Sequence, residues 1–128
     1  MSNEPTYPCT CYGYIMFDEP PGSHDICGVC AWEDDDAQLR WPQSAQGAND
    51  ASLIEAQTNY VSLGASLERR LHRARKPTPS DRREPGWRPI DLAVDDFEPT
   101  GTGDAPHPSD STALYWWRPT FWRLRRHG

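Results

Sequence analysis

The sequence predicts a small α+β domain, and three observations point to it. The chain has 128 residues of which 36% are hydrophobic, against about 45–50% in ordinary globular domains, so its core must be small. Its four cysteines all lie within residues 9–30, on either side of a β-prone stretch. A helix pattern with clear start and stop signals follows near residues 50–64. A short β-hairpin packed by one or two helices, with an irregular C-terminal tail, accounts for all three.

The hairpin is expected between two cysteine turns. The stretch Tyr14 to Phe17 is β-prone, residues 18–25 (DEPPGSHD) form a turn, and the chain returns through CGVC at residues 27–30. Trp32 follows the second turn directly, so we expect it in the core, where its indole would shield the cysteine sulfurs from water.

The main helix carries recognisable signals at both ends. Ser52 followed three residues later by Glu55 fits a capping box, and Gly64 fits a C-terminal stop. The apolar face of this helix is expected to cover the cysteine hairpin. A second, basic helix is expected over residues 66–75, before Pro77 interrupts it.

The composition changes near residue 91. Residues 1–91 are expected to form the cysteine-rich domain, and residues 92–128 an acidic linker followed by an aromatic and basic tail, largely disordered. In that tail Trp116, Trp117 and Trp122 lie among four arginines. Tryptophan and arginine are both common anchors of protein interfaces. We therefore regard these tryptophans as candidate partner-binding residues.

The four cysteines are candidate metal ligands. The N-terminal sequence lacks the features of a signal peptide and no apolar run is long enough to span a membrane, so we expect a cytoplasmic protein with reduced thiols. Two short turns of thiolates facing each other suit tetrahedral zinc. We therefore predict one structural Zn²⁺ bound by Cys9, Cys11, Cys27 and Cys30, in a zinc-ribbon-like hairpin.

Two other interpretations of these cysteines stay open. They could be redox-active or partly oxidised thiols, or simply buried core residues. The first turn, Cys9-Thr10-Cys11, is also one residue shorter than C-x-x-C. His24 or a water molecule would complete the ligand set if only three thiolates bind.

The charge pattern bears on partners. The formal net charge is −6, which argues against broad nucleic-acid binding, but residues 69–83 are rich in arginine. Arg69, Arg70 and Arg73 are the candidate partner-binding residues there. No nucleophile triad or phosphate-binding loop stands out, so the sequence favours a protein that is not an enzyme.

The stretches YPCTCYGYIMFDEPPGSHDICGVCAWEDDDAQ and NDASLIEAQTNYVSLGAS, followed by WRP at 87–89, resemble the bacterial cysteine-rich CPCC family over roughly residues 7–91. The resemblance implies a small zinc-ribbon-like binding protein. The family's first turn reads C-P-C-C-G, whereas this chain has Thr10 in place of proline and Tyr12 in place of the last cysteine. Cys11 then either replaces the missing ligand through a shifted turn, or the chain binds metal weakly or not at all.

These observations favour a non-catalytic, metal-binding protein-interaction module, with a bacterial immunity or scaffold role toward another protein as the finer expectation. The alternative is a nucleic-acid-binding zinc ribbon that uses the basic segment 69–83. The partner would be another protein in the first case and DNA or RNA in the second.

Overall fold

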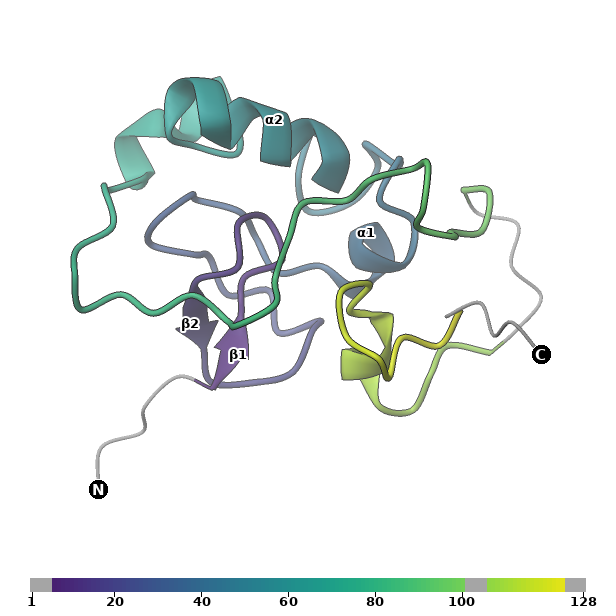
Figure 1. Ribbon diagram of the computed structural model, residues 1–128. Helices are drawn as coiled ribbons and strands as arrows, with labels where there is room; N and C mark the ends of the chain where they lie inside the picture. Colours follow the sequence, from purple (N-terminus) through teal and green to yellow (C-terminus); the bar gives the residue numbers. More distant parts are fainter. Residues whose placement is uncertain (1–5, 101–105, 124–128) are drawn as a thin grey trace.

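The structure, a computed structural model, describes residues 6–100 and 106–123. Its regular elements are short and are joined by long irregular segments (Figure 1). In chain order they are strands β1 (Tyr7–Pro8) and β2 (Ile15–Phe17), helices α1 (Asp36–Arg40) and α2 (Leu53–Leu63), and the 3₁₀ helices η1 (Glu68–Arg73) and η2 (Ser111–Leu114). No helix within the described ranges has the length and apolar character that crossing a membrane requires.

Helix α2 begins and ends where its sequence signals predict. The Ser52 side chain accepts the Glu55 backbone N–H while the Glu55 side chain accepts that of Ser52, which completes the capping box. Gly64 ends the helix in the left-handed conformation with φ 81°. Within α2, Leu53 and Ala56 are buried on the inner face, whereas Val61 is 71% exposed on the outer face. One face of the helix, which carries Leu53, Ala56 and Gln57, therefore covers the rest of the domain, and Val61 lies outside it.

The strands confirm a small hairpin fold but pair differently from the expected scheme. Strand β2 pairs antiparallel with β1, with Tyr7 opposite Phe17, and not with the segment around the second cysteine turn. That turn closes its own bridge between Ile26 and Glu33. Each cysteine turn therefore stands at the tip of its own short antiparallel pair, in a small α+β, zinc-ribbon-like arrangement.

Two helices near the cysteine turns differ from the prediction: α1 was not expected, and a 3₁₀ helix, η1, replaces the expected second helix. Helix α1 begins at the end of an acidic run, residues 33–36, because Asp35 caps it by accepting the backbone N–H groups of Ala37 and Gln38. The helix expected over residues 66–75 is the 3₁₀ helix η1, which has no side-chain N-cap. The missing cap and the following Pro77 limit this segment to a short helix.

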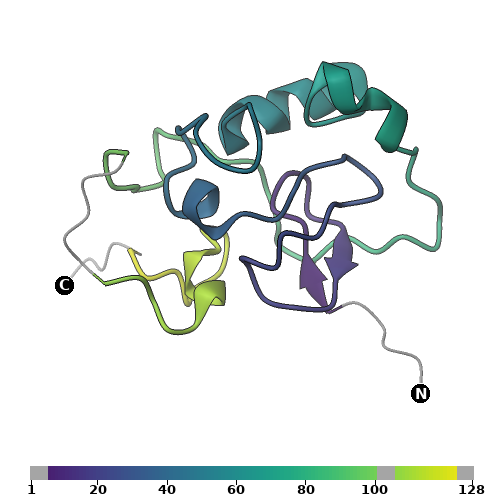
Figure 2. The same ribbon diagram turned by 180° about the vertical axis from the view of Figure 1, so that it is seen from behind.

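The C-terminal segment packs against the domain. Leu114, Tyr115, Trp116 and Phe121 are all buried in the hydrophobic core, and η2 lies beside α1 in both views (Figures 1 and 2). The core therefore extends across residue 91, where composition had suggested a boundary. Large aromatic side chains achieve this burial on an irregular backbone that has no periodic pattern to reveal it in the sequence.

Candidate metal centre

The first cysteine turn is closed by two backbone hydrogen bonds. The Cys9 N–H donates to the Tyr14 carbonyl and the Gly13 N–H donates to the Cys9 carbonyl, each at 2.7 Å. Gly13 is left-handed, with φ 84°. A Cβ at Gly13 would lie 2.6 Å from Cγ of Trp87, so the indole packs directly on the turn. Glycine is therefore required at this position both for its conformation and for space.

The second cysteine turn has the same hydrogen bonds. The Cys27 N–H donates to the Trp32 carbonyl at 2.9 Å, and the Ala31 N–H donates to the Cys27 carbonyl at 2.8 Å. Ala31 takes the left-handed conformation, with φ 66°, at the place that Gly13 holds in the first turn. The two turns are therefore repeats of one six-residue conformation, starting at Cys9 and at Cys27.

Aligning these repeats gives each position a counterpart. Cys11 corresponds to Val29, and Tyr12 corresponds to Cys30. The second turn thus has cysteines at its first and fourth positions, while the first turn has cysteines at its first and third positions.

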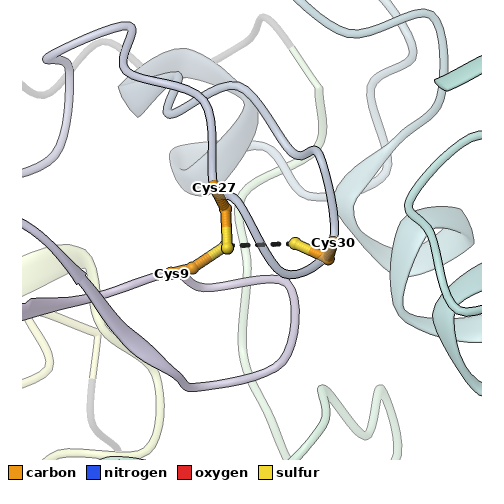
Figure 3. A group of neighbouring side chains, drawn as sticks. All are labelled: Cys9, Cys27 and Cys30. Carbon is orange, nitrogen blue, oxygen red and sulfur yellow. Dashed lines mark hydrogen bonds between the residues drawn. The ribbon is translucent and has the colours of Figure 1, made fainter. Parts of the chain in front are cut away.

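Three of the four sulfurs come together. The Sγ atoms of Cys9, Cys27 and Cys30 all lie within 4.8 Å of one another (Figure 3). The Sγ atoms of Cys9 and Cys30 are 3.5 Å apart, and each of the three residues is 1% exposed. Sulfurs bound to one tetrahedral zinc at about 2.3 Å would be about 3.8 Å apart. The group therefore fits a thiophilic metal ion in spacing and in donor type.

The thiols influence one another's protonation. Burial raises the pKa of Cys9 well above its usual value, and its hydrogen bonds to Cys27 and Cys30 add to this effect. The hydrogen bond to Cys30, together with burial, also raises the pKa of Cys27. Burial also opposes ionisation of Cys30. The pKa of Cys30 is nevertheless held well below its usual range by hydrogen bonds from three thiols and one backbone N–H, those of Cys11, Cys27, Cys9 and Trp32. The protonation of each thiol therefore depends on its neighbours, and a bound cation would displace the protons of the thiols that it coordinates.

Cys11 is buried at 0% exposure, and its thiol hydrogen-bonds to that of Cys30. Among the described residues, however, the group of mutually close ligand atoms includes Cys9, Cys27 and Cys30 but not Cys11. His24, considered above as a substitute ligand, lies apart from the group: its side chain is 59% exposed and pairs with Glu33 at 3.3 Å.

Residues that the sequence analysis did not assign to the site hold the turns in place. The Gln57 side chain donates to the Thr10 carbonyl of the first turn at 3.1 Å, and the Ser66 N–H donates to the Cys30 carbonyl of the second at 2.7 Å. Helix α2 and the segment after it therefore fix both turns. In the sequence, the signal for this support of the turns is one polar residue, Gln57, on the helix face that packs against the domain.

A buried amide supports the second turn from the opposite side. Asn49 is 0% exposed; its side chain donates to the Glu33 carbonyl at 2.8 Å and accepts the Glu33 N–H at 2.9 Å. Asn49 therefore bridges the backbone on both sides of Glu33, while Ser52 caps the helix that follows. Asp34 of the adjacent acidic run is also internal, since it accepts the Ser23 hydroxyl at 2.7 Å.

The candidate partner-binding arginines have different surroundings. Arg70 donates to the carbonyls of Ala31 and Ala48 and to the Asn49 side chain, at 3.0–3.3 Å, so it stabilises the second turn. Arg69 forms an exposed ion pair with Asp50. Arg73 is exposed on η1.

The candidate tryptophans of the tail are directed inward. Trp116 is 2% exposed and donates through Nε1 to the Arg88 carbonyl at 3.1 Å. Trp117 donates to the Glu84 carboxylate, and the Arg40 guanidinium lies 4.8 Å from the Trp122 ring centroid. All three contact the domain itself.

The fold and this thiol group define a small cysteine-rich domain with a site that can hold a metal ion. The chain belongs to the cysteine-rich CPCC family, whose family model matches residues 7–81. A search of curated proteins gave no match.

Proposed function

We propose that this protein is a non-catalytic binding module whose fold is stabilised by one zinc ion held at Cys9, Cys27 and Cys30. The observation that carries the proposal is the convergence of three buried thiols on two repeated turns. A zinc ion would join two turns that are distant in sequence, and so would compensate for the small hydrophobic core.

Burial supports a structural role for the ion. The three cysteines are each 1% exposed, and their immediate neighbours Val29 and Trp32 are 0% and 1% exposed. A substrate would have to displace this packing to reach the ion. The geometry therefore favours stabilisation of the fold over chemistry at the metal.

The partner surface that we propose lies beside η1. A groove of about 260 Å³ is lined there by Tyr60, Leu71, Arg75, Lys76 and neighbouring residues. Leu71 is 47% exposed although it is apolar, and the exposed Arg73 and Lys76 add positive charge. This combination fits an acidic protein segment that inserts an apolar side chain.

The metal part of the proposal is tested by thermal unfolding with and without added zinc. A ligand that binds only the folded state at a hundred times its Kd stabilises it by about 2.7 kcal/mol, so zinc should raise the melting temperature of the wild type. Cys27→Ser should abolish the shift, while Ser62→Ala, a change at an exposed position of α2, should keep it. An equal shift in Cys27→Ser would rule out the cysteine site.

The surface part is tested with a labelled acidic peptide that contains one leucine. Binding should weaken at least tenfold in the Arg73→Glu, Lys76→Glu double variant, and Arg69→Glu should change it little because Arg69 already pairs with Asp50. Tight binding to a single-stranded oligonucleotide, with steep weakening by salt, would instead favour the nucleic-acid-binding alternative.

A further inference from the structure

We infer that the metal is bound by three protein thiolates, and that Tyr12, not Cys11, stands where a fourth cysteine ligand would be. This inference rests on the metal site proposed above and specifies its ligand set. It identifies Cys11 as a core residue and leaves the fourth coordination position to a small molecule from solvent, such as water.

The repeated turns carry the argument. In the second turn the ligands Cys27 and Cys30 occupy the first and fourth positions, and the third position, Val29, is buried at 0% exposure. The first turn has the same two hydrogen bonds and the same left-handed residue. Its first position is Cys9 and its third is Cys11, also at 0% exposure. The repeat therefore places Cys11 on the core side of its turn, as it does Val29.

The sulfur geometry agrees with this alignment. Cys11 has a thiol beside Cys30, yet it lies outside the set of ligand atoms that are all within 4.8 Å of one another. Four sulfurs on one zinc would all be about 3.8 Å apart. Cys9, Cys27 and Cys30 approach this condition, and Cys11 would have to leave the position dictated by its turn to join them.

The side chain of Tyr12 is engaged elsewhere. Its ring centroid lies 4.6 Å from that of Tyr60 and 4.9 Å from that of Trp87, and the Arg83 guanidinium lies 4.6 Å from it. The tyrosine therefore joins an aromatic cluster that ties the first turn to α2 and to the segment around Trp87. Tyr12 is half-buried whereas the cysteines are buried, and its ring contacts direct it into this cluster.

The experiment uses Co²⁺ as a spectroscopic probe of the full-length protein and three variants. Each thiolate bound to Co²⁺ contributes to the sulfur-to-metal charge-transfer absorption. Cys11→Val, which copies Val29, should leave the absorption per Co²⁺ unchanged, and so should Tyr12→Phe, which retains the ring but removes the phenol oxygen. Tyr12→Cys should raise it by about one third and tighten Co²⁺ binding, because it adds a fourth thiolate.

The outcomes separate this inference from the proposed function. A loss of about one quarter of the charge-transfer absorption in Cys11→Val would show that Cys11 is the fourth ligand. A changed spectrum in Tyr12→Phe would show that the phenol oxygen of Tyr12 is the fourth ligand. Either result overturns the inference but leaves a metal site. Binding in Tyr12→Cys alone would show that three thiolates are insufficient and also overturns it. Absence of Co²⁺ binding in every protein would refute the metal site itself. Circular dichroism of each variant checks that the fold is retained.

Discussion

The packing of Trp87 on the first cysteine turn leads to a quantitative prediction for Gly13→Ala. Gly13 has φ +84°, and an added Cβ would lie 2.6 Å and 2.7 Å from two atoms of the Trp87 ring. The left-handed backbone alone costs a non-glycine residue about 1–2 kcal/mol. Forcing a methyl group into a packed site adds about 1–3 kcal/mol. We therefore expect Gly13→Ala to lower the free energy of unfolding by about 2–5 kcal/mol.

Gly86 provides a matched control. Its φ is +85°, almost that of Gly13, but a Cβ there would meet nothing within 4 Å. Gly86→Ala should therefore cost only the backbone term of about 1–2 kcal/mol. The difference between the two variants isolates the contact with Trp87.

Urea unfolding, followed by circular dichroism, measures both variants. With an m-value of about 1–3 kcal/mol per molar urea, the Gly13→Ala midpoint should lie about 1 M below that of Gly86→Ala. Replacing Trp87 by alanine should remove most of this extra cost, because the clash disappears. Equal midpoints for the two glycine variants would refute the packing of Trp87 on the turn.

Two further predictions concern the tail and the thiols. Leu114→Ala should destabilise the protein by about 2–5 kcal/mol, since Leu114 is 1% exposed, whereas Leu92→Ala, at a residue 51% exposed, should have little effect in the same urea experiment; equal effects would show that the tail lies outside the core. The metal-free protein should lose stability as the pH rises above about 8.5. Unfolding then lets three thiols with raised pKa values ionise at their usual pKa, whereas Cys30, with its lowered pKa, is ionised in both states above that pH and does not offset the loss. The three thiols are Cys9, Cys11 and Cys27. Metal-loaded protein should not show this loss, and unchanged stability of the metal-free protein up to pH 10 would contradict the assignment.

The features that the sequence predicted correctly depend on local interactions. The capping box of Ser52 and Glu55 and the stop at Gly64 involve neighbouring residues, so their signals lie within one short window. The burial of Trp32 and the closeness of Cys27 to Cys30 likewise follow from one short turn and from the need to bury apolar side chains. These parts of the fold and site could be predicted before the structure.

The features that differed depend on contacts between distant segments. Trp116 is held by the Arg88 carbonyl, and Trp117 by Glu84, and nothing in the tail itself reveals these partners. Similarly, Cys11 and Tyr12 could be ranked as ligands only after the backbone of the first turn was seen to repeat that of the second. The spacing of cysteines alone does not specify which side chain of a turn faces the metal.

The central claim is that one metal ion is bound at Cys9, Cys27 and Cys30, and zinc content per chain tests it most directly. Elemental analysis of the purified protein, with a thiol count before and after a chelator, should give about one zinc per chain, with the thiols reacting only after the metal is removed. Folded protein that contains no metal, and does not take up zinc when it is supplied, would contradict the account.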